Sequence, residues 1–263
     1  MEDLLYKIVA VSELAGQAIM AIYADSEGGA TSKADGSPLT LADLAADRVI
    51  AAGLAEFGWP VLSEESARTE YADRKSWQKF WMVDPLDGTK EFISRNGEFT
   101  VNIALIENGE PVLGVVYAPA LDACYFAAQG VGAFVRRGMQ AAQTVHVADH
   151  LPGELLKVVA SRSHRDSSTE TILDRLGEYQ CVSMGSSLKF CLVAEGNAHL
   201  YLRTGPTMEW DTAAAHAVVK YAGGIVCGFN GEELRYNKTD LHNPGFFVLS
   251  AADQDLRARL IVN

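Results

Sequence analysis

Apolar positions near the N-terminus repeat with the period of an amphipathic helix. They stand three or four residues apart, at Leu4, Ile8, Val11, Ala15, Ile19 and Ile22. This spacing gathers them on one face of a helix of about five turns, which we expect to end before Gly28-Gly29. The same period continues from Leu41 to Ala52, and Thr40 followed by Asp43 forms a capping box at the start of this second helix.

Strand patterns fill most of the chain from residue 60 to residue 135. Short runs rich in β-branched and aromatic residues occupy residues 60–62, 80–83, 99–106, 112–117, 124–127 and 132–135. Asn108-Gly109 lies between two of these runs and is typical of a tight β-hairpin turn. We therefore expect helices packed on an antiparallel sheet, forming a domain over residues 1–150 that ends in the polar stretch 147–153.

Strands and helices alternate in the remaining residues, 151–263. The pattern predicts strands at 156–161, 181–184, 199–203, 225–227 and 246–250, and helices at 167–176, 187–194, 211–221 and near the C-terminus. Such alternation is typical of a layered α/β unit. The fold class predicted for the whole chain is thus α+β in the first half and α/β in the second.

Composition places the chain among globular proteins that remain in solution. It has 263 residues, of which 48% are apolar and 21% charged, enough for one large or two modest domains. We find no repeat, no low-complexity tract and no apolar run of the length that a membrane span needs. Met1-Glu2-Asp3 is acidic where a signal peptide would be basic, so we expect a cytoplasmic protein.

Net charge limits which molecules the protein can bind, and the spacing of its cysteines indicates their chemical state. A formal charge of −12 argues against a general electrostatic interaction with nucleic acid or an anionic membrane. An anionic substrate would therefore require local cations at its site. The four cysteines form no C-x-x-C pair, and buried reduced thiols are the simplest account of them.

The stretch from Trp81 to Ile93 carries the strongest chemical signal. Asp84-Pro85 is predicted to break the strand, Asp87-Gly88 to turn the chain, and residues 89–93 to open a short helical turn. Two carboxylates this close repel one another unless a cation lies between them. Oxygen ligands suit a hard ion such as Mg²⁺.

Other polar residues stand at the ends of predicted strands or the starts of predicted helices. Glu64-Glu65 ends a strand and reads either as a solvated loop or as part of a site. Asp211 precedes a strong helix former and reads as an N-cap or as a metal ligand. The segment 185–189, Gly-Ser-Ser-Leu-Lys, offers hydroxyls, N–H donors and a charge to a phosphate, or is an ordinary helix start with a solvated lysine.

The motif Asp-Pro-Leu-Asp-Gly-Thr at 84–89 resembles the signature of the Mg²⁺-dependent, lithium-sensitive phosphatases that include inositol monophosphatase. Residues 90–93 and 185–196 resemble one branch of that family, the 3′(2′),5′-bisphosphate nucleotidases. Similarity extends over nearly the whole chain, through segments 32–43, 62–65, 96–103 and 210–224. The resemblance implies a layered αβαβα sandwich, with the polar segment 32–38 either a mobile lid over the metals or a plain surface loop.

The resemblance also implies roles for individual residues. Two or three Mg²⁺ ions would be held by Glu64, Asp84, the Leu86 carbonyl, Asp87 and Asp211. Catalysis would fall to Asp43, Glu64 and Thr89: Asp43 accepts a hydrogen bond from Thr89, and Thr89 and Glu64 orient the attacking water. The substrate-binding residues implied in this way are Glu64, Leu86, Asp87, Gly88, Thr89, His164, Ser186, Ser187, Lys189, Arg203 and Asp211.

The implied function is hydrolysis of the 3′-phosphate of adenosine 3′,5′-bisphosphate to AMP and phosphate, without a covalent phosphoenzyme. The sulfated precursor is a possible second substrate, which would place the enzyme in sulfur assimilation. Peripheral attachment to the inner face of a membrane rests on the resemblance alone, and the charge of −12 does not favour it. Two alternatives stay open: an inositol or sugar monophosphatase, and a non-catalytic nucleotide-binding sensor. A P-loop or Rossmann protein is excluded because neither glycine fingerprint is present.

Overall fold

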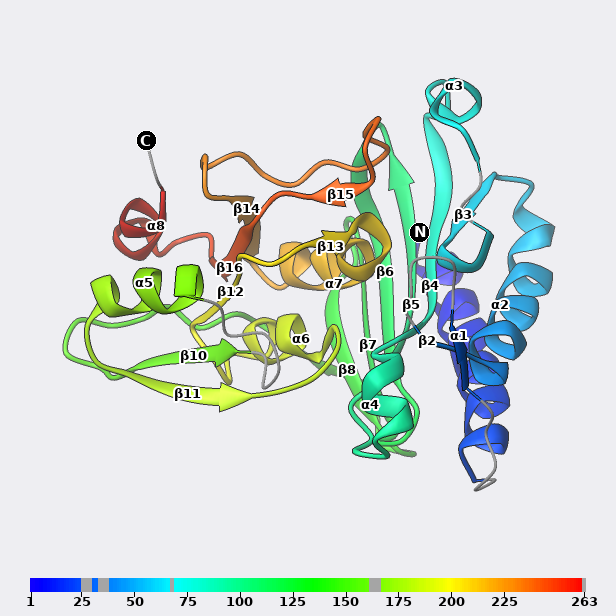
Figure 1. The fold of residues 1–263 in the computed structure, drawn as a ribbon, viewed down its shortest axis with the longest axis horizontal. Helices are drawn as coiled ribbons and strands as arrows, with labels where there is room; N and C mark the ends of the chain where they lie inside the picture. The colour runs from blue at the N-terminus through cyan, green and yellow to red at the C-terminus, as the bar shows by residue number, and fades with distance from the viewer. Residues whose placement is uncertain (25–29, 33–37, 67–68, 161–166, 262–263) are drawn as a thin grey trace.

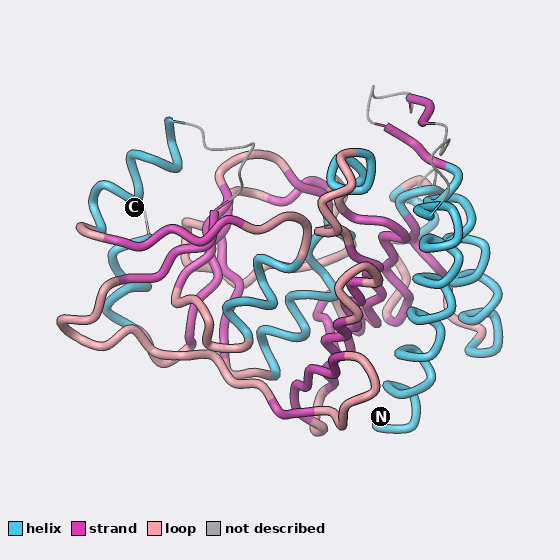
Figure 2. Tube along the Cα trace, turned by 90° about the horizontal axis from the view of Figure 1, so that it is seen from below, coloured by secondary structure: helices cyan, strands magenta, loops and turns pink. Residues whose placement is uncertain are grey.

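Two β-sheets alternate with three layers of helices in a computed structural model of the protein, which describes residues 1–24, 30–32, 38–66, 69–160 and 167–261. Figure 1 shows the layers in cross-section, with helices α1 (Glu2–Ala24) and α2 (Leu41–Leu54) on one outer face. Helices α5 (Ser167–Leu176) and α8 (Gln254–Leu260) cover the opposite outer face. Figure 2 shows the same succession of helices and strands from a perpendicular direction. The layered sandwich expected from the sequence is therefore confirmed.

The first sheet has seven strands in the order β3-β4-β5-β6-β7-β8-β9. Their bounds are β3 Val61–Ser63, β4 Lys79–Asp87, β5 Thr100–Glu107, β6 Glu110–Ala118, β7 Ala123–Ala128, β8 Gly132–Arg137 and β9 Gln143–Thr144. Neighbouring strands are antiparallel except at one edge, where β3 runs parallel to β4. The expectation of a purely antiparallel sheet is wrong at that edge. The predicted hairpin between β5 and β6 is present, and both Asn108 (φ 53°) and Gly109 (φ 78°) adopt the left-handed conformation that such a turn requires.

The second sheet has five strands in the order β11-β10-β12-β16-β14. Their bounds are β10 Leu156–Ala160, β11 Tyr179–Ser183, β12 Leu200–Arg203, β14 Gly224–Gly228 and β16 Phe246–Ser250. Strand β10 is parallel to β11 and β12, whereas β16 is antiparallel to both of its neighbours. Helices α6 (Leu188–Ala194) and α7 (Glu209–Tyr221) lie between the two sheets (Figure 1).

Smaller elements complete the described residues. They are β1 Ala30–Ser32, β2 Pro38–Thr40, the 3-10 turns Ala55–Phe57 and Glu64–Ser66, α3 Tyr71–Arg74, α4 Thr89–Ile93, β13 Thr207–Met208 and β15 His242–Asn243. Strands β1 and β2 pair with each other and flank the predicted lid, whose central residues 33–37 lie outside the described residues. The lid therefore stays a prediction.

Strand β5 shows how the sequence pattern supports burial on both faces. Val101, Ile103 and Leu105 belong to the apolar cluster under α1 and α2. Their neighbours Ala104 and Ile106 point the opposite way, into the cluster beneath α7. Because alternate side chains of a strand point to opposite faces, a central strand that is covered on both sides is apolar along most of its length.

Strand β4 differs from the prediction that Asp84-Pro85 would end it. The strand continues to Asp87, and its register against β5 shifts between Asp84 and Asp87. Such an irregularity leaves Pro85 opposite no ladder partner, so the missing N–H of proline removes no hydrogen bond. Asp84 points to the same face as Phe80 and Met82, which is the face that α7 covers.

Helix α1 is, by length and composition, apolar enough to cross a membrane: a stretch of 18 residues within it has a mean hydropathy of 1.4. This corrects the expectation that the chain has no such run. Leu5, Ile8 and Ile19 on this helix are completely buried in the cluster between the helices and the first sheet. Burial of this kind is what a core helix requires, and it accounts for the apolar composition.

Candidate metal centre and anion pocket

Three carboxylates from three separate elements meet at one edge of the first sheet. Glu64 opens the 3-10 turn after β3, Asp84 lies in β4, and Asp211 lies in the first turn of α7. One carboxylate oxygen from each residue lies within 4.8 Å of the others. Asp84 is 1% exposed, so its charge is almost completely removed from water. The arrangement brings together residues that are far apart in the sequence.

Crowding and burial oppose ionisation of these groups. The pKa of Asp84 is raised well above its usual value, first by burial and then by the charges of Glu64, Asp87 and Asp211. The pKa of Asp211 is raised to about 8, again by burial first and then by Asp87. A divalent cation reverses this balance because it favours the ionised form of every carboxylate around it. The donor set is all oxygen, which fits a hard ion such as Mg²⁺.

The turn after Asp84 shapes the backbone around the cluster. Asp84 Oδ1 accepts a hydrogen bond from the Leu86 N–H at 3.1 Å, and the Thr89 hydroxyl donates to the Leu86 carbonyl at 3.4 Å. Gly88 has φ +89°, a left-handed conformation that glycine adopts without strain. The chain then enters the short helix α4, as predicted for residues 89–93.

Asp87 is held by the two serines of the segment 185–189. Its Oδ2 accepts hydrogen bonds from Ser186 Oγ at 2.5 Å, Ser187 N at 2.7 Å and Ser187 Oγ at 3.1 Å. Behind them, Asn102 Nδ2 donates to Ser187 Oγ at 3.0 Å. The two hydroxyls thus contact the carboxylate of a predicted metal ligand, whereas the sequence analysis assigned them to substrate.

Asp211 occupies the third position of α7 and not its N-cap. Helix α7 begins at Glu209, and Met208 is the N-cap residue. Asp211 Oδ2 accepts a hydrogen bond from the Met208 N–H at 2.8 Å, and this fixes the orientation of the carboxylate. The N-cap interpretation was therefore wrong by three positions, because the helix starts earlier than its apolar pattern indicates.

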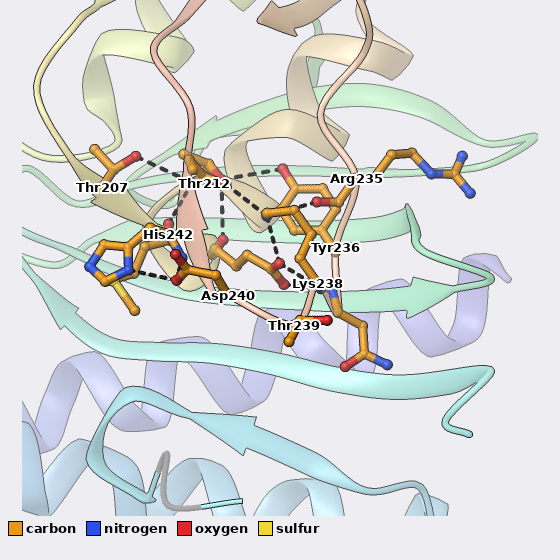
Figure 3. A network of polar contacts seen from close by, with 12 residues as sticks. Thr207, Thr212, Arg235, Tyr236, Lys238, Thr239, Asp240 and His242 are labelled. Atoms are coloured by element: carbon orange, nitrogen blue, oxygen red, sulfur yellow. Dashed lines mark hydrogen bonds and ion pairs between the residues drawn. The ribbon is translucent and has the colours of Figure 1, made fainter. Parts of the chain in front are cut away.

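The first turn of α7 is anchored by a polar network that sequence reasoning missed. Glu209 is completely buried, and its carboxylate accepts hydrogen bonds from the N–H of Asn237, the N–H of Lys238 and the Lys238 ammonium, at 2.6, 2.9 and 2.6 Å. Figure 3 shows this segment beside Thr212, whose hydroxyl lies 3.3 Å from that of Tyr236. The only sign of this network in the sequence was that an acidic residue, Glu209, stands two positions before Asp211. Its partners are 28 and 29 residues away.

A pocket adjoins the acidic cluster, and its lining includes two basic side chains, Lys189 and Arg203, beside three acidic ones. Asp87, Gly88, Glu91, Ser186, Ser187, Lys189, Phe190, Tyr201, Arg203, Thr207, Asp211, Thr212 and Phe246 line it. Lys189 is only 8% exposed, and its ammonium donates to the Ser186 carbonyl at 2.6 Å. Burial lowers the pKa of Lys189, and the nearby Asp87 opposes that shift. The pocket thus places a poorly solvated cation beside the carboxylates.

One predicted residue, Asp43, is not joined to the cluster in the described part of the chain. Asp43 is buried, and its Oδ2 accepts from the Thr40 N–H at 2.8 Å and the Thr40 hydroxyl at 2.6 Å, which is the predicted capping box. Among the described residues no hydrogen bond links Asp43 to Thr89. His164 lies outside the described residues, so its role stays a prediction.

Comparison with known proteins identifies the family. A profile of the inositol monophosphatase family matches residues 1–261. The chain belongs to this family. Two relatives, each called 3′(2′),5′-bisphosphate nucleotidase CysQ, come from Shigella flexneri and Escherichia coli strain K12. Each is 49% identical over 249 residues, which cover 93% of this chain and 99% of the relative.

A solved structure supports the same assignment. CysQ from Bacteroides thetaiotaomicron, described as a bacterial member of the inositol monophosphatase family, is 43% identical and superposes with a TM-score of 0.86. The similarity covers 96% of this chain and 99% of that one. The chain is thus an enzyme of a phosphatase family, and the resemblance read from its motifs is confirmed.

Proposed function

We propose that the protein is a Mg²⁺-dependent 3′(2′),5′-bisphosphate nucleotidase that hydrolyses the 3′-phosphate of adenosine 3′,5′-bisphosphate. One observation carries the proposal: the acidic cluster adjoins the pocket that contains Lys189 and Arg203, and the two share Asp211. A bisphosphate nucleotide needs both, because one phosphate reacts while the other is bound. The names of the relatives from Shigella flexneri and Escherichia coli support the same substrate.

In this proposal the metal ligands are Glu64, Asp84, the Leu86 carbonyl, Asp87 and Asp211, around two or three Mg²⁺ ions. When bound there, Mg²⁺ would supply Lewis acidity and would make a water easier to deprotonate. Asp84 and Asp211 are oriented by the N–H groups of Leu86 and Met208. Asp87 is oriented by Ser186 and Ser187, so the carboxylates are held in place before substrate arrives.

The remaining residues act on the water and the nucleotide. Glu64 and Thr89 orient a water for in-line attack on phosphorus, with Asp43 supporting Thr89. The new bond joins the water oxygen to phosphorus and the bond from phosphorus to the 3′-oxygen breaks. The proton that the water gives up balances the one that the departing 3′-oxygen takes up to become the ribose hydroxyl. Lys189 and Arg203 bind the second phosphate, and His164 contacts the base.

Further parts of the proposal rest on resemblance and sequence. The sulfated precursor of the nucleotide is a second substrate, the reaction belongs to sulfur assimilation, and the enzyme works in the cytoplasm. The chain divides into a metal-binding domain at 1–150 and a domain at 151–263 that completes the site and binds the nucleotide.

The test is phosphate release from adenosine 3′,5′-bisphosphate and from inositol 1-phosphate, each with Mg²⁺, with EDTA and with added Li⁺. We expect a Mg²⁺-dependent, lithium-inhibited preference for the nucleotide. Preference for inositol phosphate would support the metal centre but contradict the proposal that the substrate is a bisphosphate nucleotide. Tight nucleotide binding without phosphate release from either compound would leave a binding protein on the same fold.

A further inference from the structure

The hydroxyl of Tyr201 has no hydrogen-bond partner among the residues that the structure describes, although the residue as a whole is almost completely buried. Tyr201 is 3% exposed and lines the pocket beside Lys189 and Arg203. Throughout the residues that the structure describes, its hydroxyl makes no hydrogen bond. Two other tyrosine hydroxyls do have protein partners: that of Tyr221 donates to the Pro111 carbonyl at 3.2 Å, and that of Tyr236 lies 2.9 Å from His216 Nδ1.

The ring of Tyr201 is fixed, so its hydroxyl is held within the pocket. Phe190 packs edge-on against it with ring centroids 5.1 Å apart, and Phe246 does so at 5.7 Å. The Lys189 ammonium lies 5.7 Å from the ring centroid, over its face. Packing on both sides leaves the ring little freedom to turn away.

Strand geometry directs Tyr201 and Arg203 to the same place. They stand two residues apart on β12, so their side chains leave the same face of the sheet. Lys189 reaches the pocket from α6, which packs over that face. Three groups that donate hydrogen bonds therefore converge from two elements.

The chemistry of this triad selects an acceptor that bears negative charge. Burial raises the pKa of Tyr201, so the phenol stays protonated and can donate. Lys189 and Arg203 can only donate as well. Asp87 and Asp211 line the same pocket, so an anion would be attracted to the side of the two cations.

We propose that Tyr201 is a specificity-determining residue whose hydroxyl donates a hydrogen bond to an oxygen of the substrate's second phosphate, the 5′-phosphate. This inference rests on the proposed function and adds a residue to it. It accounts for the unpartnered hydroxyl, because a bound phosphate oxygen supplies the missing acceptor.

The test compares Tyr201→Phe with the unaltered enzyme on two substrates that differ only in the 5′-phosphate. These are adenosine 3′,5′-bisphosphate and adenosine 3′-monophosphate. We expect KM for the bisphosphate to rise roughly 10- to 100-fold, the usual effect of losing a hydrogen bond to a charged group, with kcat nearly unchanged. KM for the monophosphate should not change, and that result also shows that the variant is folded.

Tyr221→Phe is the matched control, since it removes a hydroxyl whose acceptor is the Pro111 carbonyl. It should leave both KM values as they are. An equal change for both substrates in Tyr201→Phe, or no change for either, would overturn the inference.

A binding measurement separates this inference from the proposed function. Calorimetry with 5′-AMP and with adenosine reports the contribution of the 5′-phosphate without any turnover. We expect Tyr201→Phe to weaken binding of 5′-AMP and to leave adenosine unaffected. If the unaltered protein fails to hydrolyse the bisphosphate yet shows this difference, the proposed function falls and the role of Tyr201 stands. Equal binding of 5′-AMP by both proteins would overturn the role of Tyr201.

Discussion

Individual carboxylates in this protein take their properties from their neighbours. Asp84, Asp87 and Asp211 are each fixed by N–H or hydroxyl donors, and each lies close to the others. In the absence of a cation their mutual repulsion opposes folding, because the folded state brings the charges together. The metal-free protein is therefore less stable than it would be without these charges, but its metal ligands are already in position.

Replacing Asp84 with asparagine should therefore separate activity from stability. Asp84→Asn keeps the shape of the side chain and removes one charge from the cluster. We expect loss of phosphate release with Mg²⁺, and an unfolding temperature in EDTA that is unchanged or higher. Asp122→Asn, at an exposed site on the loop between β6 and β7, is the control. Near-normal turnover by Asp84→Asn would exclude a metal centre here.

Lys189 provides a second prediction at the scale of one residue. Lys189→Met retains most of the buried stem and removes the ammonium. We expect KM for adenosine 3′,5′-bisphosphate to rise roughly tenfold or more, because a charged hydrogen bond to a phosphate is lost. KM for adenosine 3′-monophosphate should change much less. Lys7→Met, in the exposed ion pair with Glu56, is the control, and an equal effect on both substrates would contradict the assignment.

Helix α7 is the element on which the site depends most. It packs between the two sheets, carries Asp211 in its first turn, and lies against β6 at Gly114. A Cβ at Gly114 would overlap the Ala214 carbonyl oxygen and come within 2.7 Å of Ala217 Cβ. The absence of a side chain at this position therefore sets how closely α7 approaches the sheet.

Gly114→Ala should push α7 away from the sheet and shift Asp211 relative to Asp84. We expect a loss of about 1–3 kcal/mol in the free energy of unfolding, as for other overpacked cores. The Mg²⁺ concentration for half-maximal activity should rise as well. The unfolding free energy comes from urea titration and the Mg²⁺ requirement from phosphate release.

Gly16→Ala is a matched control in helix α1, which packs on the opposite face of the same sheet. A Cβ there would come within 2.8 Å of Tyr117 Cδ1, beneath α1. This variant should also be destabilised, with its Mg²⁺ requirement unchanged. If both variants altered the requirement equally, the effect would be one of general stability and not of the position of α7.

A buried histidine on α7 links stability to pH. His216 is completely buried, and burial lowers its pKa, so it is neutral in the folded state. Its Nε2 lies 3.1 Å from Glu233, and this hydrogen bond, with help from Lys220, lowers the pKa of Glu233 to about 2 from 4.5. Because the folded pKa of Glu233 is depressed, its contribution to stability is complete above pH 4.5 and is lost as the pH falls towards about 2.

Glu233→Gln should flatten that part of the pH profile. We expect the unaltered protein to lose stability steadily as the pH falls from 4.5 to about 2, and the variant to lose less over the same interval. The pKa of His216 is also depressed, so stability already begins to fall as the pH drops below 6.5, the ordinary pKa of histidine. This effect is present in both proteins. Denaturant unfolding across this range measures the difference, and Glu56→Gln at an exposed ion pair is the control. Parallel pH profiles for Glu233→Gln and the unaltered protein would contradict the prediction.

At the scale of the whole molecule, the metal centre joins distant parts of the chain. Asp84 comes from the first sheet and Glu64 from the turn that follows its edge strand β3, whereas Asp211 comes from the helix layer between the sheets. Three apolar clusters fill the spaces between the five layers, so the positions of these elements depend on packing throughout the molecule. A ligand that bridges the sheet and the helix should stabilise the whole fold.

Mg²⁺ should accordingly raise the unfolding temperature, and EDTA should reverse the effect. For a ligand that binds only the folded state, a concentration one hundred times Kd adds about 2.7 kcal/mol to the free energy of unfolding. Differential scanning calorimetry with increasing Mg²⁺ measures the shift. Asp84→Asn should show little of it, and an equal shift in both proteins would place the stabilising ion elsewhere.

Local signals in the sequence determined the longer elements, the hairpin turn, the Thr40–Asp43 capping box and the acidic motif at residues 84–87. These depend on the identity of near neighbours, through helical period, strand alternation and turn chemistry. Boundaries shifted where the pattern was interrupted: β4 runs through Pro85, and α7 begins at Glu209. The family signature extended the prediction to the fold, because the motif and its spacing are specific.

Tertiary structure alone decided which polar groups meet. It brought the hydroxyls of Ser186 and Ser187 to Asp87, buried Glu209 among donors from residues 237 and 238, and placed Tyr201 in the lining of the pocket. Each of these outcomes depends on residues far apart in the sequence that become neighbours only when the layers pack. The sequence by itself determined which reactive and charged groups the protein has, and long-range packing determined which of these groups lie together in one site.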